Sequence, residues 1–490
     1  MSDVATKELP EHWNIATFGD IADLLRGVSY KKTDASKEPV SGKVPVLRAN
    51  NIGYGLNFDD LVYVPEKLVK KEQYIKKGDI IIAMSSGSKH LVGKAAQANE
   101  GYNCAYGAFC ANLRVTEGID PKYVAYFYSS QENLKRISAS SKGSNINNLK
   151  REHILEAPIP LAPPDQQKLI VAKIEELFSH IDAGIEALKK AKQLLKQYRQ
   201  SVLKAAVTGE LTKEWREKNK DKLEPASQLL ARIHKERCQK WEAQQLEEFK
   251  SKGKTPKDNK WKEKYKAPLG YSYEGELPEI PDGWVWVSPA EIASTDDYAL
   301  AIGPFGSNLK VSDYRGEGVS LVFVRNIRTH DYSTTNGKYV THKKAMELRA
   351  HSISGRDVLI TKMGEPPGDA SIYPDTAPDA IITADCIKWR FSILIEKPEL
   401  FVHIISSQII KDQILSRTKG VAQKKISLGT FKSIAFPLPP LEEQAEILRE
   451  LEQKFYASER LLKELDAQLL KIEKNKQSVL SSAFSGRLRN

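Results

Sequence analysis

The sequence has few of the residues and patterns that mark several large classes of protein. Its 490 residues include four cysteines without a CxxC pair, so we expect neither a zinc site nor a disulfide framework, but free thiols in a reducing cytoplasm. No run of about 18 apolar residues occurs, so no membrane-spanning helix is expected. The first residues, MSDVATKELPEHW, lack an apolar core, so we expect no signal peptide and a cytoplasmic location.

Motifs of common nucleotide- and metal-dependent enzymes are also missing. The sequence contains no GxxxxGK[ST] loop for ATP and no HExxH spacing for a metal. The proline pairs that begin at Pro163, Pro366 and Pro439 do not give the Asp/Asn-Pro-Pro-aromatic pattern of an amino-methyltransferase. Glu365 precedes one of these pairs, and a turn explains it more simply than a catalytic acid. We therefore expect no catalytic residue, no bound cofactor and no metal ligand in this chain; a carboxylate cluster for Mg²⁺ that only the fold assembles stays open as the alternative.

The chain is basic, with a net charge of +11 and a pI near 9.1. Its hydrophobic content of 41% is ordinary for a globular protein. A positive charge of this size favours a polyanionic partner, and nucleic acid is the first candidate.

The sequence repeats itself at a fixed distance. The segment SSQ at 129–131 returns at 406–408, and QSVL at 200–203 returns at 477–480, each 277 residues further on. A looser copy upstream places the ELP of the N-terminus again at 276–278. One offset over some eighty positions indicates two copies of a domain with its attached helix, because a solenoid has a far shorter period. Such a chain can act as a covalent pseudo-dimer.

Two proline-rich segments each precede a long helical pattern. After APIPLAPP at 157–164, apolar residues recur in a heptad until about Ala206, with Asp165 as the expected N-cap. A second heptad follows PLPP at 437–440, and Arg199 and Lys476 stand at equivalent seam positions. Stripes of about 40 residues, roughly 60 Å at 1.5 Å per residue, exceed the need of one domain face. We expect an antiparallel coiled-coil pair; helices packed on their own domains are the alternative.

The remaining segments are rich in short strand patterns. Apolar runs between Gly, Pro and Asn, such as Asp79–Ala83 and Ser320–Val324, predict two globular domains, and Pro121–Leu134 has helical spacing. Residues 223–249 could be helical, and Lys250–Lys266, with eight lysines and two acids, is interpreted as a solvated linker.

The predicted fold class is α+β, with two strand-rich globular domains joined by two long antiparallel coiled-coil helices and duplicated about a pseudo-two-fold. The predicted boundaries are 1–160 for the first globular domain, 161–211 for the first long helix, 212–275 for a charged helical and linker segment, 276–436 for the second globular domain and 437–490 for the second long helix.

In this order of segments the chain resembles the specificity subunit (S subunit) of type I restriction-modification systems. The resemblance is carried by ELPEHWNIATFGDIAD, VPVLRANNI, KKGDIIIAMSSGS and SSKGSNINNLK, by the paired boundaries APIPLAPPDQQKLIVAKIEELF and AFPLPPLEEQAEILRELEQKF, and by QSVLKAAVTGELTKEW with its copy QSVLSSAFSGRLRN. It covers nearly the whole chain and is weaker from 276 to 436.

The resemblance implies a non-catalytic, sequence-specific DNA-recognition subunit of a restriction system. Each globular domain would be a target-recognition domain that reads one half of a bipartite double-stranded site. The helices would set the gap between the halves and dock two copies of a methyltransferase (modification) subunit, and restriction/translocase subunits would join them. The methyl donor, ATP and Mg²⁺ would belong to these partners, and no membrane would be involved.

Candidate DNA-binding residues lie on three segments of each domain, because base edges and phosphates are read by basic, amide and hydroxyl side chains on protruding loops. Those of the first domain are Arg48, Asn50, Asn51, Ser85, Ser86, Ser88, Lys89, Lys142, Ser144, Asn145 and Asn147. Those of the second are Arg325, Asn326, Arg328, Lys362, Lys419, Gln423, Lys424 and Lys425. A solvated turn is the alternative for each segment, since Asn, Gly and Ser favour turns.

Two other functions stay open at this point. One is a self-contained restriction enzyme or methyltransferase with cryptic catalysis, and the missing motifs count against it. The other is a coiled-coil architectural protein that binds DNA through charge alone. Two divergent globular domains count against this second function, because non-specific binding scarcely distinguishes sequences.

Overall fold

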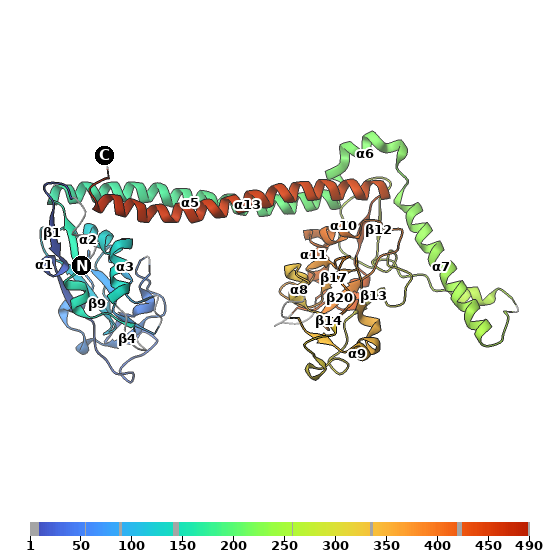
Figure 1. Ribbon diagram of the computed structural model, residues 1–490, viewed down its shortest axis with the longest axis horizontal. Helices are drawn as coiled ribbons and strands as arrows, with labels where there is room; N and C mark the ends of the chain where they lie inside the picture. Colours follow the sequence, from blue (N-terminus) through green and yellow to red (C-terminus); the bar gives the residue numbers. More distant parts are fainter. Residues whose placement is uncertain are drawn as a thin grey trace. The chain divides into compact units, whose positions relative to one another are not determined.

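The computed structural model describes residues 9–53, 55–87, 91–140, 147–256, 258–333, 337–418 and 424–488. The chain forms two compact units, residues 1–191 with 464–490 and residues 192–463. Each unit contains one globular domain and a part of each of two long helices, α5 (Pro164–Val207) and α13 (Leu441–Phe484) (Figure 1). The predicted α+β class with two duplicated domains and two long helices is confirmed.

Two sheets build the globular domain of the first unit. A four-stranded antiparallel sheet has the order β2-β9-β5-β7, and a three-stranded sheet has the order β4-β3-β8 with β3 and β8 parallel. The strand bounds are Ala22–Arg26 (β2), Lys43–Leu47 (β3), Val62–Pro65 (β4), Ile80–Ala83 (β5), Ala95–Gln97 (β7), Ala105–Tyr106 (β8) and Cys110–Val115 (β9). All four residues of β5 are buried, as the continuous apolar run at this strand requires.

Four helices complete this domain: α1 (Phe18–Ile21), α2 (Pro121–Tyr128), α3 (Gln131–Ser140) and α4 (Arg151–Leu155). The single helix predicted for Pro121–Leu134 is wrong, because the chain breaks between α2 and α3. The Ser130 hydroxyl accepts a hydrogen bond from the Asn133 N–H at 3.4 Å, and Ser407 does the same for Ile410 at 3.4 Å. The repeated SSQ is therefore an N-cap that starts a new helix.

The second globular domain has the same architecture. Its sheets have the orders β13-β20-β17-β18 and β15-β14-β19-β16, and β14 and β19 are again a parallel pair. The bounds are Leu300–Ile302 (β13), Val319–Val322 (β14), Tyr339–Val340 (β15), Ser352–Ile353 (β16), Val358–Thr361 (β17), Ala370–Ile372 (β18), Ala380–Ile382 (β19) and Cys386–Trp389 (β20). The strand predicted to reach Val324 ends at Val322, because helix α8 (Val324–Thr329) starts there.

An aromatic cluster centres the core of this second domain. The indole of Trp389 is fully buried. It stacks on Phe391 at 4.1 Å between ring centroids and meets Phe401, Phe431 and Phe436 edge-on at 5.1 to 5.6 Å. Trp389 ends β20 and Phe391 follows it, and the other rings come from helices α10 (Pro398–Ile405) and α12 (Leu428–Lys432) and from strand β21 (Phe436–Leu438). Helices α9 (His342–Glu347) and α11 (Gln408–Ser416) complete the domain.

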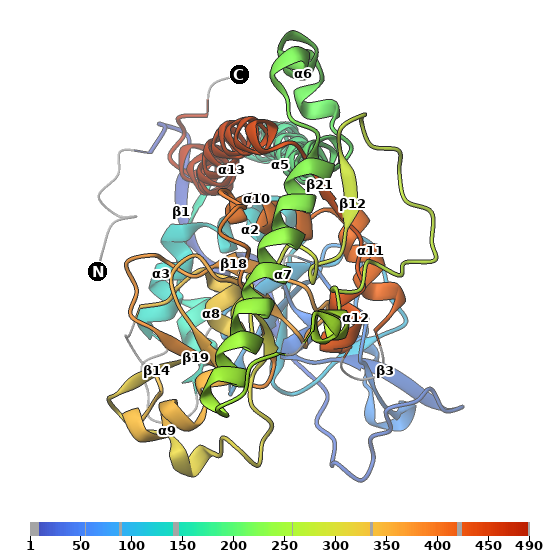
Figure 2. The same cartoon turned by 90° about the vertical axis from the view of Figure 1, so that its right-hand side faces the viewer.

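A helical arm follows α5 in the second unit. It consists of α6 (Lys213–Asn219) and α7 (Ala226–Ser251), which Figure 2 shows from the side. The interpretation of 250–266 as a simple solvated linker is wrong in part, because Lys260–Lys264 forms a 3₁₀ helix. Trp261 stacks on Trp241 of α7 at 5.9 Å, and Tyr265 packs on the same indole at 5.5 Å. The return segment is held to α7 by these aromatic contacts, which outweigh the surrounding lysine charge.

The long helix α5 starts two residues earlier than predicted. It begins at Pro164, so Asp165 lies in the first turn and is not the N-cap. Proline is tolerated at the first helical position because the N–H that it lacks has no partner there. An acid in the first turn favours the positive end of the helix.

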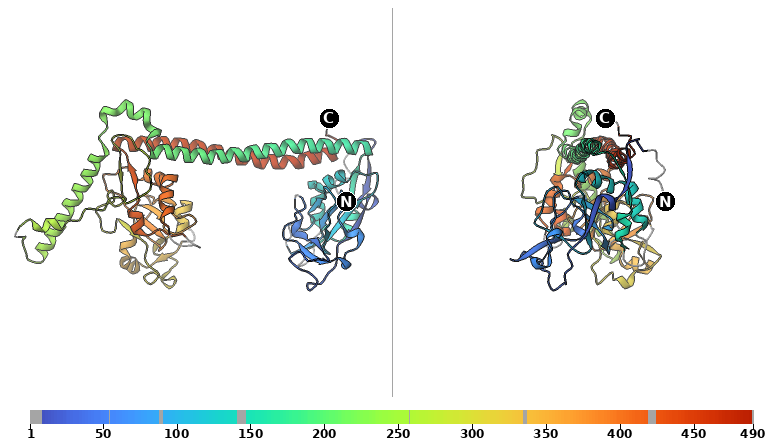
Figure 3. Two further views of the ribbon diagram at one scale, coloured as in Figure 1. Left: turned by 180° about the vertical axis from the view of Figure 1, so that it is seen from behind. Right: turned by 90° about the vertical axis from the view of Figure 1, so that its left-hand side faces the viewer.

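The two long helices pack antiparallel in both units, and Figure 3 shows them side by side. In the first unit, Lys476 Nζ lies 5.1 Å from the centroid of Phe178 and 2.6 Å from Asp182 Oδ1. In the second unit, the Arg199 guanidinium lies 4.8 Å from the centroid of Phe455. In the repeat, position 178 corresponds to 455 and position 199 corresponds to 476. The same contact therefore occurs twice, and each time the first half of one helix packs against the second half of the other. The predicted basic seam residues thus stack on aromatic rings.

Each helix ends against the entry segment of the other copy's domain. Gly486 packs on Pro10 in the first unit, and Gly209 packs on Pro281 in the second; both glycines have positive φ. After these prolines, strand β1 (Asn14–Thr17) pairs with β11 (Pro158–Leu161), and β12 (Val285–Val287) pairs with β21. The structure therefore aligns Pro10 with Pro281, and the alignment of the N-terminal ELP with 276–278 is wrong.

All four cysteines are free, and three of them are buried. Burial raises the pKa of Cys104, Cys110 and Cys386 to about 12, so these thiols stay protonated near neutral pH and are weak nucleophiles. Within the described ranges, no helix is long and apolar enough to span a bilayer.

Candidate DNA interface

Two of the three candidate segments of the first domain meet in one short ladder. Strand β6 (Ser85–Ser86) pairs with β10 (Asn147–Asn148), with Asn147 opposite Ser86 and Asn148 opposite Ser85. The Leu149 N–H donates to the Met84 carbonyl at 2.8 Å. We refer to residues 84–86 and 147–149 as the first ladder.

The second domain brings its own candidate segments together in the same way. Met363 and Lys425 form an antiparallel bridge, the Ile426 N–H donates to the Lys362 carbonyl at 3.0 Å, and the Gly364 N–H donates to the Lys424 carbonyl at 3.3 Å. We refer to residues 362–364 and 424–426 as the second ladder. The two ladders follow β5 and β17, the equivalent strands of the two domains. The sequence predicted these segments as separate candidates, and the fold places the two segments of each ladder side by side.

Some of the predicted DNA-binding residues lie outside the described residues. These positions are Ser88, Lys89, Lys142, Ser144, Asn145, Lys419 and Gln423, and the side chain of Asn147 belongs with them. Ser85 and Ser86 are half-buried, and their hydroxyls lie on the short strand β6.

The charge of the second ladder lies on Lys424 and Lys425, whose side chains are exposed. Lys362 is half-buried; its Nζ donates to the Ala384 carbonyl at 3.0 Å and lies 6.0 Å from the centroid of Phe305. The two exposed ammonium groups suit phosphate contacts, which need mobile cations at the surface.

The third candidate segment of each domain is a short helix in which the side chain of an asparagine accepts from the N–H of the residue before the helix. In the 3₁₀ helix Ala49–Asn51, Asn51 is buried, accepts from the Arg48 N–H at 2.9 Å and donates to the Asp59 carbonyl at 2.7 Å. In α8, Asn326 accepts from the Phe323 N–H at 2.9 Å and donates to the Asp331 carbonyl at 2.9 Å. Both amides are thus engaged with backbone, while Asn50 is exposed. Asn51 and Asn326 shape the turn, a role that the sequence pattern alone did not separate from base reading.

The arginines of these segments form surface ion pairs. Arg48 Nη2 lies 2.8 Å from Asp60 Oδ2, and Arg328 Nε lies 2.8 Å from Asp369 Oδ2. Arg328 also packs against the main chain of Gly364, leaving no room for a side chain there. The third segment of the second domain therefore adjoins the second ladder. Exposed pairs of this kind contribute about 0–1 kcal/mol, so either arginine can exchange its carboxylate for a phosphate at small cost.

A small cavity of about 250 Å³ lies beside α8. Arg325, Asn326 and Thr329 line one side, and Tyr332 and Tyr373 line another. Burial raises the pKa of Tyr332, so its hydroxyl stays protonated and can donate. The hollow adds polar and aromatic surface to the neighbourhood of the third segment.

The first testable prediction separates the turn-forming asparagine from its exposed neighbour. Asn51→Ala should lower the free energy of unfolding by about 1–3 kcal/mol, because it removes two side-chain hydrogen bonds to the backbone of the turn, each contributing about 0.5–1.5 kcal/mol. Asn50→Ala should change stability by less than about 0.5 kcal/mol, as surface substitutions usually do. Urea unfolding followed by tryptophan fluorescence measures both. Equal losses of stability would contradict the assignment of Asn51 to the turn.

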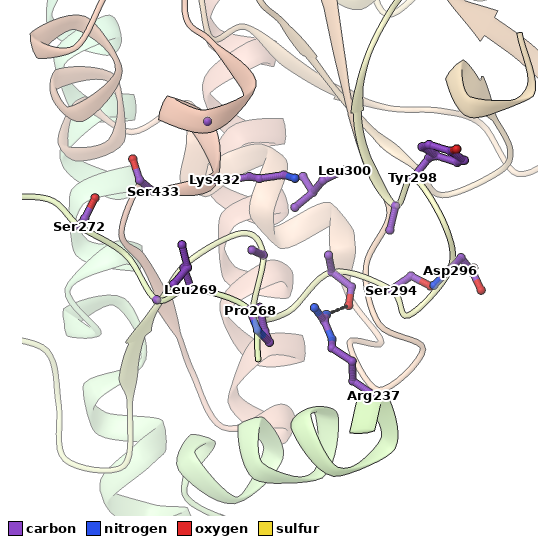
Figure 4. A pocket seen from close by; sticks show the side chains of 15 residues that line it. Arg237, Pro268, Leu269, Ser272, Ser294, Asp296, Tyr298, Leu300, Lys432 and Ser433 are labelled. Carbon is purple, nitrogen blue, oxygen red and sulfur yellow. Dashed lines mark hydrogen bonds between the residues drawn. The ribbon is translucent and has the colours of Figure 1, made fainter. Parts of the chain in front are cut away.

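A wider cavity of about 680 Å³ lies between α7 and the second domain (Figure 4). Arg237 of α7 donates to the Ala293 carbonyl at 2.6 Å, and Lys432 and Asp296 also line the hollow. In the part of the chain that the structure describes, no group of three or more His, Cys, Asp or Glu side chains is placed to hold a metal ion.

Sequence reasoning missed an aromatic residue at each ladder. Phe109 and Phe305 are both strongly exposed. The Phe109 carbonyl accepts hydrogen bonds from the first ladder, and the Phe305 ring lies near the Lys362 side chain of the second. The sequence could have indicated their exposure, because both lie next to turn-forming residues, in Gly107-Ala-Phe109 and in Gly303-Pro-Phe305-Gly306. An aromatic residue between turn formers is displaced from a strand face and stands in a loop.

A second missed pair of residues supports the strands that lead into the ladders. Asp79 and Asp357 are buried, and they pair with Arg114 at 2.6 Å and Arg390 at 2.7 Å. Each aspartate also accepts a backbone N–H of the preceding turn, from Lys76 at 2.8 Å and from Ser354 at 3.0 Å. These bonds fix the turn before β5 and before β17, and so orient both ladders.

Comparison with known proteins agrees with this geometry. The family model described as type I restriction modification DNA specificity domain matches residues 10–196 and 317–471. The chain is 29% identical to the type I restriction enzyme EcoKI specificity subunit of Escherichia coli K12, and the alignment covers 98% of this chain and 90% of the relative. The StySPI specificity subunit of Salmonella potsdam is 29% identical with the same coverage.

Solved structures share the fold. A chain from a structural study of the assembly and conformational transition of a type I restriction-modification system has a TM-score of 0.63 at 16% identity, covering 98% of this chain and all of that one. The HsdS subunit from Thermoanaerobacter tengcongensis has a TM-score of 0.52 at 16% identity and 99% coverage of both chains. With two matched segments, a duplicated fold and relatives aligned over nearly their whole length, this chain belongs to the type I restriction-modification DNA specificity family.

Proposed function

We propose that each globular domain reads one half of a bipartite DNA sequence through its ladder and the loops beside it. One observation carries this proposal: the two domains share sheet order, capping serines and ladder position, yet the ladder residues differ. Serine and asparagine stand in the first ladder, and lysine stands in the second. Two domains that read different DNA sequences are expected to keep the same scaffold and to differ in the residues of their binding loops, and these two domains differ at the ladder.

The chemistry of each ladder fits this role. Serine and asparagine can donate to and accept from base edges in the major groove, and lysine contacts guanine or phosphate. Both ladders are short and stand at the end of a buried strand, so their side chains are presented on a rigid base.

The long helices fit a docking role for protein partners. Several large apolar side chains on them are strongly exposed: Leu169, Leu194, Tyr198, Tyr456, Leu461 and Leu470. Exposed apolar side chains on a helix are surface that a protein partner can cover. Methyltransferase subunits, in two copies, are the proposed occupants, with restriction/translocase subunits joining the assembly.

The chain itself is proposed to be non-catalytic and to bind no cofactor. The methyl donor, ATP and Mg²⁺ are assigned to the partner subunits. Incubating the purified chain with DNA and labelled methyl donor tests this assignment. Methyl transfer that is abolished on replacing one carboxylate or histidine would overturn it.

Competition binding tests the recognition function. The assembled complex is bound to its labelled site and challenged with unlabelled site or with random DNA at physiological salt. Specific binding is typically 10³- to 10⁷-fold tighter than non-specific binding, so random DNA should compete poorly. Equal competition by the two DNAs would favour an architectural protein that binds through charge.

The second testable prediction concerns the exposed cations of the second ladder. Replacing Lys424 and Lys425 with alanine should weaken DNA binding and flatten its salt dependence, by about 0.9 slope units for each phosphate that is no longer neutralised. Binding is measured as a function of salt with the assembled complex. Lys218→Ala with Lys220→Ala on the helical arm removes the same charge from exposed positions elsewhere and is the matched control. An unchanged slope in the ladder variant would show that this ladder does not face DNA.

A further inference from the structure

Two phenylalanine side chains are far more exposed than any other phenylalanine of the chain. Of 14 phenylalanines, Phe109 is 70% exposed and Phe305 is 65% exposed, while Phe58, the next, is 37% exposed. Single exposed apolar residues are common and need no explanation. These two differ because both stand at a ladder.

Phe109 is fixed by its main chain to the first ladder. Its carbonyl accepts hydrogen bonds from the Met84 N–H at 2.9 Å and the Ser85 N–H at 3.1 Å. The next residue, Cys110, is the buried partner of Ala83 in the main sheet. The exposed ring therefore stands on a rigid strand end beside Ser85.

Phe305 reaches the second ladder from a different loop. It follows β13 in the turn Gly303-Pro-Phe305-Gly306, where its carbonyl accepts from the Asn308 N–H at 2.8 Å. Its ring centroid lies 6.0 Å from Lys362 Nζ, and the Lys362 main chain belongs to the second ladder.

The two phenylalanines are not copies of one ancestral residue. In the second domain the carbonyl that receives the ladder N–H, from Lys362 at 2.7 Å, belongs to Asp385. Asp385 is thus the counterpart of Phe109, and Phe305 comes from elsewhere in the sequence. Because the two rings stand at non-equivalent positions, the duplication of the domain does not explain why each ladder has one. A function that both ladders share does explain it.

We propose that Phe109 and Phe305 are the apolar readers of the two half-sites, each ring packing against the 5-methyl group of a thymine in the major groove. The inference rests on the proposed function, in which the ladders face DNA. The thymine methyl is the apolar feature of the major-groove edges, and phenylalanine is a side chain that contacts it. A ring held on a fixed backbone loses little conformational entropy on binding.

Deoxyuridine substitution tests this packing, because it removes only the methyl group. The assembled complex is bound to DNA with thymine, or with uracil throughout one half-site. For the wild type, uracil should weaken binding about fourfold, the equivalent of one buried carbon group at about 0.8 kcal/mol. Phe109→Ala should bind thymine DNA more weakly and lose its sensitivity to uracil in one half-site only. Phe305→Ala should lose it in the other half-site.

Matched variants complete the experiment. Phe109→Leu and Phe305→Leu keep an apolar side chain at the same place and should retain part of the thymine preference. Ile393→Ala and Val40→Ala remove exposed apolar residues, 84% and 50% exposed, outside both ladders, and should behave as the wild type. Unchanged melting temperatures show that each variant is folded.

Two results would overturn the inference: no loss of affinity for the wild type with uracil in either half-site, or retained sensitivity to uracil in the alanine variants, which are then weakened equally on thymine and uracil DNA. The lysine variant of the second ladder separates this failure from failure of the proposed function. If Lys424 and Lys425 matter while the rings do not, the ladder faces DNA without an apolar reader. If neither matters, the ladder does not face DNA.

Discussion

Replacing Glu443 with alanine is expected to lower the free energy of unfolding of the second unit by about 3–5 kcal/mol, because it breaks a buried ion pair from one side. Glu443 is fully buried near the start of α13. It accepts hydrogen bonds from Arg216 at 2.7 Å, from the Thr212 hydroxyl at 2.7 Å and from Trp284 Nε1 at 2.8 Å. Alanine would leave all three donors without this acceptor. Denaturant unfolding followed by circular dichroism measures the loss of stability.

The duplicated chain supplies its own control for this substitution. The residue 277 positions earlier is Gln166, which is exposed and accepts a single hydrogen bond, from Trp13 Nε1 at 2.9 Å. Gln166→Ala should therefore cost only about 1 kcal/mol, the usual net value of a neutral hydrogen bond. The loss of stability caused by Glu443→Gln should lie between these two values, because glutamine keeps an acceptor for Trp284 but lacks the charge. Equal losses of stability for the alanine variants at 166 and 443 would show that the ion pair between Arg216 and Glu443 does not stabilise the second unit.

A paired insertion in the long helices is expected to lengthen the gap between the half-sites without changing either half. Lys192 and Leu462 lie at one level of the helix pair, seven residues from Arg199 and Phe455 in opposite directions. Four residues inserted after each add about 6 Å of helix. This length corresponds to between one and two base-pair steps of about 3.4 Å. Sequencing of DNA methylated by the assembled complex shows the gap and both halves.

The single insertion is the control for this experiment. Four extra residues in α5 alone should unwind the pair locally, because the partner helix lacks the matching turn. We expect weaker methylation and no clean new gap from that variant. An altered half-site with an unchanged gap in the paired variant would show that the helices do not set the distance.

The long helices and the duplication were accessible from sequence because their signals are local and periodic. The heptad from Val171 to Val202 is repeated in α13, and it requires a partner along its whole length. The central strands were accessible for the same reason, since a fully apolar run such as Ile80–Ala83 is buried in any fold that contains it. The start of α5 and the break between α2 and α3 were missed by a few residues, because a proline at the first helical position and a serine cap set helix ends through local backbone effects that periodicity does not register.

The candidate interface could be predicted in part. Its segments were found because glycine, serine, asparagine and lysine gather in loops after strands. Their pairing into ladders was not accessible, since Met84 and Leu149, or Lys362 and Ile426, are more than sixty residues apart in the chain. The assignment of Asn51 to the turn, and the exposure of Phe109 and Phe305, depend in the same way on distant partners.

The sequence by itself determined the family, the order of the segments and the two helices, because repeats, boundary motifs and heptads are properties of neighbouring residues. The tertiary structure alone decided which polar residues of the candidate segments are exposed and which are engaged in holding the fold. It also decided that each helix ends on the other copy's domain, where Gly209 and Gly486 pack against Pro281 and Pro10. The physical reason is that hydrogen bonding and burial depend on what the fold brings near a residue, and its neighbours in sequence do not specify this.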